Sequence, residues 1–399
     1  MFTILVFSFS AIKFCSPVYH NATSPHGYHI IHSTVVFKHG LRAPIDKIPG
    51  NEIPWNCTGG EWLYPGGSGL SDEVRFKSQF IIKQIERQSF LKGNCKAGEL
   101  LNEGIEQMKD LGKHLARTYR VLVDESKKYG NNIFSFRSTY NNRCLASMQI
   151  VAQQLLKNDK QIDVFVANEE LESLVPNSYS CPKLGILYNQ TFEKNSSFYN
   201  DKMKYEKHLD EIKNISGITV VPHWSRIGEY LVTRKCAHIN LPGKFNESFM
   251  NESVNLLVNF YKNVMKLEKG KSFASGLLLS EIYLGMRDFL AGSSRSKINL
   301  ICGHTLTLVS ILSSLNLTVK YKPYGSYIAF ELYEKDDKAN KFIVRVLVDG
   351  KLMITIDFDE FKKKVMNLRP SEEECQIRYP YLEKDKKDPG IKLLQFAFS

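Results

Sequence analysis

Residues 35–44 read Val-Val-Phe-Lys-His-Gly-Leu-Arg-Ala-Pro, and the rest of the chain is organised around this stretch. The apolar, β-branched run that begins at Thr34 stops at Phe37 and gives way to a cationic turn that contains glycine. This pattern is typical of a buried strand that delivers a polar loop at its carboxyl end. Because open α/β sheets bind their ligands at such strand ends, we predict that His39 lies at a ligand site.

Two cations, Lys38 and Arg42, flank His39. Neighbouring positive charges disfavour protonation of an imidazole and leave it with a neutral nitrogen. A neutral imidazole held among cations is suited to attack an anionic group such as a phosphoryl. On this stretch alone, a hydrogen-bonded structural histidine with two solvated cations is an equally good interpretation.

A second strand is predicted from Ile133 to Phe136, with Arg137 at its end. Ser138-Thr139 can cap a helix that begins near Asn141. A guanidinium beside a helix N-terminus makes an anion site. We therefore expect Arg137 to bind an anion, whereas Arg143, inside the helix, is expected to form a structural ion pair.

A third apolar strand is predicted from Ile298 to Cys302, followed by Gly303-His304 and by an apolar helix from Thr305 to Leu315. The order of strand, polar turn and helix is that of the first site. Three strand ends that carry His39, Arg137 and His304 can converge on one cleft, so His304 is a predicted anion ligand.

Together these stretches resemble the histidine acid phosphatase family. Residues 38–44 are similar to its R-H-G-x-R-x-P signature, residues 136–143 contain F-R-S-T followed by an arginine, and Gly303-His304-Thr305 stands where the family has G-H-D. The resemblance extends from about residue 30 to about residue 380. It implies an α/β fold with a doubly wound, mostly parallel sheet and a helical cap inserted at roughly 155–270.

The resemblance also implies a reaction, the hydrolysis of a phosphate monoester through a phosphohistidine at His39, without a cofactor or a metal ion. In the family the phosphate is bound by the residues that correspond here to Lys38, Arg42, Arg137 and His304. Further along the chain, Asp349-Gly350 separates two apolar runs, which predicts an antiparallel hairpin at the edge of the sheet.

Two catalytic positions depart from the family pattern. Lys38 replaces the first arginine and keeps its charge but loses the planar fork for phosphate oxygens. Thr305 replaces the aspartate that protonates the leaving alcohol, and no Asp or Glu occurs between Asp288 and Glu331. Loss of a general acid costs about 10²- to 10⁴-fold in rate. The sequence thus favours an attenuated acid phosphatase. The alternative is a catalytically inactive secreted family member that binds phosphate-containing ligands.

The composition supports a globular chain with an anionic small-molecule ligand. Of the 399 residues, 43% are hydrophobic and 24% charged, with a net charge of +11. The basic residues are scattered and no base-reading motif accompanies them, which argues against nucleic acid. No C-x-x-C or H-x-x-x-H pair predicts a metal site. A homodimer is left open.

Residues 1–16 are interpreted as a secretory signal peptide, with an apolar core from Phe2 to Ile12 and cleavage near Ser16, which leaves 17–399 as one phosphatase-like domain. A buried first strand is the alternative for this segment. No later stretch has the roughly 20 apolar residues of a membrane anchor, so we predict a secreted extracellular protein. Eight N-x-S/T sequons support glycosylation, at Asn21, Asn56, Asn189, Asn195, Asn214, Asn246, Asn251 and Asn316.

Cleavage near Ser16 would remove Cys15 and leave seven cysteines, so that at least one thiol is free or bridges two chains. Position in the family pattern implies a Cys181–Cys375 disulfide, and a Cys57–Cys95 disulfide would then close an insertion.

The pairing of the remaining cysteines is left open. Cys236 stands where the family has a bridged cysteine, but the expected partner position falls at about Tyr327. Cys144 and Cys302 lie in apolar helix and strand patterns and are expected to be buried thiols.

Overall fold

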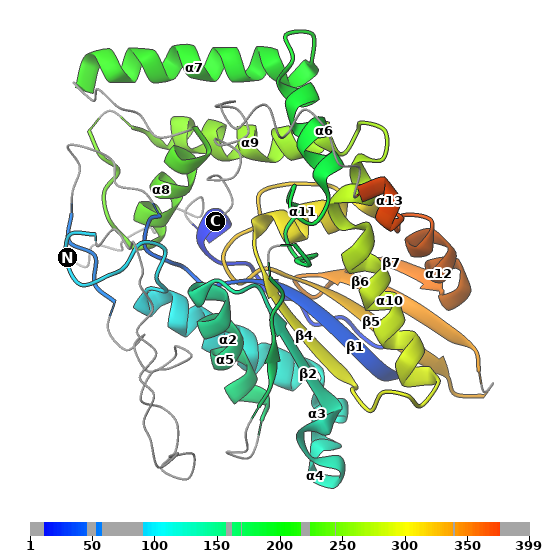
Figure 1. Ribbon diagram of the computed structural model, residues 1–399. Coiled ribbons are helices and arrows are strands. Elements are labelled where there is room, and N and C mark those ends of the chain that lie inside the picture. Colours follow the sequence, from blue (N-terminus) through cyan, green and yellow to red (C-terminus); the bar gives the residue numbers. More distant parts are fainter. Residues whose placement is uncertain are drawn as a thin grey trace, which may run out of the picture.

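The computed structural model describes residues 12–45, 53–57, 91–156, 162–168, 170–216, 224–243, 245–337 and 340–375. Within them, seven strands form one sheet in the order β3-β2-β4-β1-β5-β6-β7 (Figure 1). The strands are β1 (Tyr28–Lys38), β2 (Phe134–Ser138), β3 (Val164–Phe165), β4 (Ile298–Gly303), β5 (Tyr327–Lys335), β6 (Phe342–Val348) and β7 (Lys351–Asp357).

The sheet has a parallel half and an antiparallel half. Strands β3, β2, β4 and β1 are parallel to one another, whereas the pairs β1–β5, β5–β6 and β6–β7 are antiparallel. The predicted hairpin is confirmed between β6 and β7. Asp349 and Gly350 both have positive φ, 51° and 80°, as tight hairpin turns require. A Cβ on Gly350 would lie 1.8 Å from the backbone oxygen of His20, so the position demands glycine.

Helices cover both faces of the sheet. Successive residues of β1 point to opposite faces, and because they are apolar both faces must be covered. Val35 and Phe37 pack in one apolar cluster with α2 and α5, and Val36 packs in another with α10, α11 and α12. These helices are α2 (Asn102–Thr118), α5 (Asn142–Leu155), α10 (Leu277–Leu290), α11 (Thr305–Ser314) and α12 (Phe358–Met366). The shorter elements are α1 (Ile12–Cys15), α3 (Arg120–Asp124), α4 (Ser126–Tyr129), η3 (Gly130–Ile133), η4 (Ser272–Gly276) and α13 (Glu372–Cys375).

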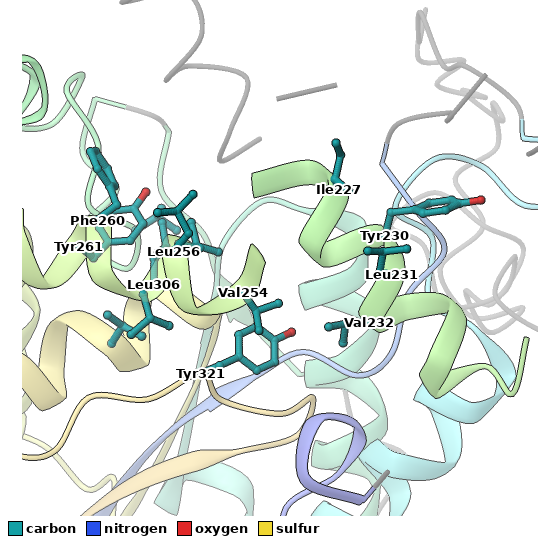
Figure 2. Packing of buried hydrophobic residues seen from close by; sticks show 14 of the residues in the cluster. Ile227, Tyr230, Leu231, Val232, Val254, Leu256, Phe260, Tyr261, Leu306 and Tyr321 are labelled. Atoms are coloured by element: carbon teal, nitrogen blue, oxygen red, sulfur yellow. The ribbon is translucent and has the colours of Figure 1, made fainter. Parts of the chain in front are cut away.

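Four further helices gather at one end of the sheet (Figure 1), and we call them the cap helices. They are α6 (Pro182–Phe192), α7 (Ser197–Ser216), α8 (Trp224–Cys236) and α9 (Glu247–Val264). Their apolar side chains share a third cluster with Leu41, which follows β1, and with Tyr321 and Tyr324, which precede β5. Figure 2 shows this cluster, with Tyr321 and Leu306 beside residues of α8 and α9. The cap is therefore packed against the strand ends that carry the predicted site.

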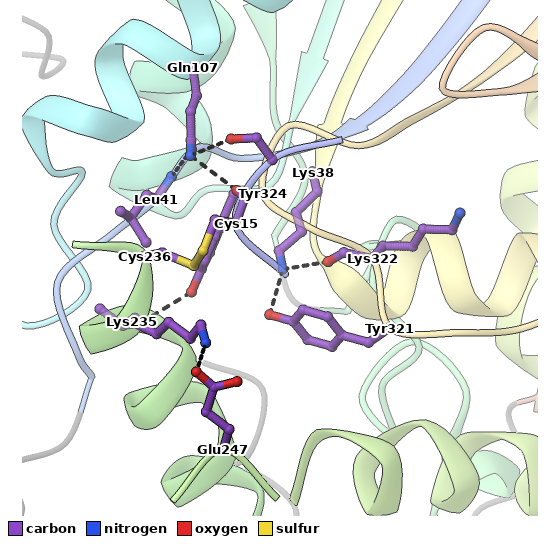
Figure 3. The surroundings of a disulfide bond; sticks show 12 residues. Cys15, Lys38, Leu41, Gln107, Lys235, Cys236, Glu247, Tyr321, Lys322 and Tyr324 are labelled. Carbon is purple, nitrogen blue, oxygen red and sulfur yellow. Dashed lines mark hydrogen bonds and ion pairs between the residues drawn. A yellow bond between two sulfur atoms is a disulfide. The ribbon is translucent and has the colours of Figure 1, made fainter. Parts of the chain in front are cut away.

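Three disulfides join the described residues. Cys181–Cys375 and Cys57–Cys95 confirm the two predicted pairs, and Cys144 and Cys302 are confirmed as buried free thiols. Cys236, whose pairing the sequence left open, bonds to Cys15 (Figure 3). Cys15 lies within the segment that the predicted cleavage near Ser16 would remove, and among the described residues it is one partner of a disulfide. These partners are 221 positions apart, so the pairing arises from tertiary structure and not from local pattern.

The features that bear on export are partly visible. Residues 1–11 of the predicted signal peptide lie outside the described residues, as does the side chain of Asn214. Asn251 is half-buried, and six other predicted sequon asparagines are exposed: Asn21, Asn56, Asn189, Asn195, Asn246 and Asn316. None of the described helices combines the length and the apolarity needed to cross a bilayer.

The Cys15–Cys236 bond yields a stability prediction. Cys236→Ser should lower the free energy of unfolding by about 2–5 kcal/mol, because the bond constrains a long loop of the unfolded chain. Cys15→Ser and the double variant should lose the same amount, since all three remove one bond. Denaturant unfolding measures these losses. Alkylation of Cys236 in the native, unreduced protein would contradict the pairing.

Candidate active site

The two predicted histidines meet because β1 and β4 are paired in parallel. The register sets Lys38 opposite Gly303, so each histidine follows directly on a paired strand end. The His39 N–H donates to the carbonyl of Gly303 at 3.2 Å, and the two imidazole rings lie edge to face with centroids 5.3 Å apart. Of the three residues expected to converge, His39 and His304 are brought together.

The ring of His39 is buried and held in one orientation. Its Nδ1–H donates to the carbonyl of Gly40 at 2.8 Å, which leaves Nε2 as the nitrogen with the lone pair. Burial lowers the pKa of His39 well below its usual value, and the positive charges of Arg143, His304, Arg42 and Lys38 lower it further. The neutral imidazole predicted from the sequence agrees with this environment.

The loop after His39 is fixed by close packing on α2 and α5. The Gly40 N–H donates to Ser147 Oγ at 3.1 Å, and the Leu41 N–H donates to Gln107 at 2.9 Å. A Cβ on Gly104, in the first turn of α2, would lie 2.1 Å from the Leu41 carbonyl oxygen, so only glycine allows this approach. The loop thereby presents His39 from a rigid support.

His304 is the N-cap residue of α11, and its N–H donates to Thr307 Oγ1 at 3.0 Å. Thr139 Oγ1 lies 3.0 Å from His304 Nε2, and Cys144 Sγ lies 3.6 Å from the same nitrogen. Thr305, the position where the family has its aspartate, is buried as the first residue of the helix.

Arg42 is buried beside His39 and ion-paired to the cap. Its Nη1 donates to the carbonyl of Ala43 at 3.1 Å, and its Nη2 lies 2.6 Å from Glu229 Oε2 on α8. Burial acts to lower the pKa of Arg42, but the Glu229 carboxylate, together with Tyr324 and Tyr321, raises it above its usual value. Glu229 was missed at the sequence level because it lies 187 positions from Arg42 and carries no motif.

The ammonium group of Lys38 lies over the rings of two tyrosines, Tyr321 and Tyr324 (Figure 3). Its Nζ donates to Tyr321 Oη at 3.1 Å and to the Lys322 carbonyl at 3.0 Å, and it lies 4.1 Å from the ring centre of Tyr324. Burial lowers the pKa of Lys38 to about 7, against the attraction of Glu229. Lys38 therefore adds a positive charge to the site at acid pH, and its contacts with the two tyrosines fix the position of that charge.

Arg137 does not lie where the sequence predicts it. It is inside β2, and alternation turns it away from the face on which Phe136 packs. Its guanidinium is bound to Glu281 on α10, to Ser173 Oγ at 3.0 Å and to Glu172 at 3.6 Å. Arg137 is thus held among carboxylates, and the positive charges that chiefly lower the pKa of His39 are those of Arg143, His304, Arg42 and Lys38.

Arg143 takes the place that the sequence assigned to Arg137. It is buried in the first turn of α5, where side chains point back toward the helix N-terminus and so toward the strand ends. It exerts the largest charge effect on the pKa of His39. Arg143 Nη1 lies 3.4 Å from Asn141 Oδ1, and Asn141 Nδ2 lies 3.5 Å from His304 Nε2. The local signal was available, since a cation in the first turn of a helix after a strand end is itself an anion-site pattern.

Two histidines among buried cations, at the carboxyl ends of parallel strands, define an anion-binding α/β site. The chain belongs to the histidine phosphatase superfamily (branch 2), whose family model matches residues 29–349.

Curated relatives agree with this family. The chain is 24% identical to a probable acid phosphatase of Schizosaccharomyces pombe, over 77% of this chain and 74% of the relative. It is 22% identical to counting factor 60 of Dictyostelium discoideum, over 77% of each chain. It is 23% identical to human prostatic acid phosphatase, over 75% of this chain and 73% of the relative.

Solved structures confirm the fold. A phytase of Hafnia alvei in complex with myo-inositol hexakis sulphate superposes with a TM-score of 0.57 at 12% identity, over 89% of this chain and 100% of the phytase. A multiple inositol polyphosphate phosphatase of Bifidobacterium longum in complex with phosphate gives a TM-score of 0.55 at 10% identity, over 92% and 99%.

The two arginines give a matched test of the site. Phosphate at one hundred times its dissociation constant should stabilise the folded protein by about 2.7 kcal/mol, because it binds the native state alone. Arg143→Ala should abolish this shift, whereas Arg137→Ala should keep it, since Arg137 is bound to carboxylates elsewhere. Thermal unfolding with and without phosphate measures both. If only Arg137→Ala lost the shift, Arg137 and not Arg143 would be the anion-binding residue, which would contradict this assignment.

Proposed function

We propose that this protein is an exported acid phosphatase that hydrolyses phosphate monoesters through a phosphohistidine at His39. One observation carries the proposal: the buried, neutral ring of His39 is fixed through Nδ1 at Gly40, with His304 and Arg143 beside it. A nucleophile that is neutral, oriented and surrounded by positive charge meets the requirements of phosphoryl transfer from an anionic ester.

The reaction has two steps. The lone pair of His39 Nε2 forms a bond to phosphorus while the bond to the alcohol oxygen breaks, and that oxygen takes up a proton. Water then attacks the phosphohistidine, the phosphorus–nitrogen bond breaks, and inorganic phosphate leaves. The phosphoryl oxygens are bound by Arg42, Arg143 and His304. Lys38 adds its positive charge from its position beside Tyr321 and Tyr324. Most of the catalysis is then positioning and charge stabilisation.

Thr305 sets the leaving-group preference of this site. A threonine hydroxyl is too weak an acid to protonate an alkoxide, so esters of poorly acidic alcohols react slowly, whereas an aryl phosphate expels a stabilised phenolate. The proposed enzyme is accordingly an attenuated phosphatase. The cap helices close the site over the alcohol portion of the ester.

Export is part of the proposal. The three disulfides fit an oxidising compartment, and the exposed sequon asparagines fit a glycosylated surface. Because Cys15 is bonded to Cys236, we place cleavage of the leader before Cys15 and not near Ser16. The mature chain then keeps all three bridges.

Rates on two esters test the function. The wild type should hydrolyse p-nitrophenyl phosphate at acid pH and glycerol phosphate much more slowly. Thr305→Asp should raise the glycerol phosphate rate by about 10-fold or more and the aryl rate less, because only the alkoxide needs the added acid. His39→Ala should abolish both activities. Inactivity of both the wild type and Thr305→Asp, with phosphate still bound, would favour the non-catalytic binding protein instead.

A further inference from the structure

A cap residue, Glu229, brings a carboxylate to the cations beside His39. Its Oε2 lies 2.6 Å from Arg42 Nη2. The Arg42 side chain is only 4% exposed and that of Glu229 is 24% exposed, so Glu229 is the more accessible partner of this ion pair. The charge of Glu229 also acts on four other groups: Lys38, Tyr261, Tyr321 and Tyr324.

The helix that carries Glu229 is fixed in place. Thr233, one turn further along α8, lies with its Oγ1 3.2 Å from Tyr324 Oη, so residues 229 and 233 share the face that meets the site. A Cβ on Gly228 would lie 2.8 Å from Ser253 Cβ, which shows how closely α8 packs on α9. The end of α8 is bonded through Cys236 to Cys15. Glu229 therefore belongs to a rigid part of the cap.

The direction of the reaction points the leaving group toward this helix. In an in-line displacement the leaving oxygen lies opposite the attacking nitrogen. His39 attacks from the end of β1, and α8 packs beyond that end, against Arg42 and Tyr324. The alcohol oxygen consequently departs toward the cap and away from the sheet.

We propose that Glu229 is the general acid that remains in this site and that it makes up only in part for the carboxyl missing at Thr305. This proposal rests on the proposed phosphatase function. A substrate phosphate competes with Glu229 for Arg42, and two anions at one cation favour the protonated carboxyl. As the bond from phosphorus to His39 forms and the bond to oxygen breaks, Glu229 gives its proton to that oxygen. Glu229 regains its proton from the solvent before the next turnover.

Two other glutamates lie near the site and are the alternative candidates for the general acid. Glu172 and Glu281 both bind Arg137, and Glu281 also accepts from Ser173 at 2.9 Å. Glu172 accepts from the Leu174 N–H at 2.7 Å, and burial raises its pKa. Neither is bonded to Arg42. Glu172→Gln is therefore the matched control for Glu229→Gln.

The experiment compares the same two esters in the isosteric variants. Glu229→Gln should lower kcat for glycerol phosphate by about 10²-fold, and kcat for p-nitrophenyl phosphate by far less, because only the alkoxide needs the proton. Any change in anion affinity from the lost ion pair with Arg42 should shift KM for both esters alike. Glu172→Gln should leave the ratio of the two kcat values at its wild-type level.

Two further variants separate acid catalysis from a structural role. Glu229→Asp should recover part of the glycerol phosphate rate, since it keeps the acid. Thr305→Asp should raise the glycerol phosphate rate more in the Glu229→Gln background than in the wild type, because the two carboxyls supply the same proton. Equal gains in the two backgrounds are expected if Glu229→Gln merely disturbs α8.

The outcomes distinguish the two claims. An unchanged rate ratio in a folded, active Glu229→Gln variant overturns the role of Glu229 and leaves the phosphatase intact. A selective loss in Glu172→Gln assigns the acid to the Arg137 cluster and overturns the proposal. Absence of His39-dependent aryl hydrolysis in the wild type overturns the function and the general acid together.

Discussion

The parallel pairing of β1 with β4 is the constraint on which the rest of the site depends. Because Lys38 is in register with Gly303, the residues that follow, His39 and His304, are brought within ring contact. A shift of one residue would turn the apolar side chains of β1 toward the wrong faces of the sheet, so the hydrophobic cores on both faces maintain the register. The chemistry of the site is thus protected by packing that is remote from it.

The charges at these strand ends require a balance that the cap provides. Lys38, Arg42 and Arg143 are all buried near one another, and burying unpaired cations is costly. The tyrosines and a backbone carbonyl hold Lys38, and Glu229 holds Arg42. The cap therefore supplies the anion that balances the buried charge of Arg42 and that a phosphate must compete with.

The sequence predicted what depends on local pattern. The strand ends at His39 and His304 and the Asp349-Gly350 hairpin follow from periodicity and turn chemistry, and the structure has them. The contacts that decide chemistry depended on tertiary structure. Glu229 and Arg42 are 187 positions apart in the sequence, and no pattern near either residue predicts their ion pair.

The sequence assigned the anion site to Arg137, whereas the structure favours Arg143. Arg137 and Arg143 are six positions apart in one motif, and the choice between them depends on which face of β2 points to the site and how far α5 reaches back. Alternation in the strand turns Arg137 toward Glu281, and the first turn of the helix turns Arg143 toward His39. Strand boundaries drawn one or two residues too early placed Arg137 at a strand end, although it lies inside β2.

The central claim is that His39 becomes covalently phosphorylated. Mixing the protein with p-nitrophenyl phosphate, quenching in alkali after milliseconds and mapping the peptides by mass spectrometry tests it directly, because a phosphohistidine survives alkali. The account predicts one phosphoryl group on the peptide that contains His39, lost when turnover is complete and absent from His39→Ala. Turnover without any phosphoryl group on His39, or with the group on another residue, would contradict the account.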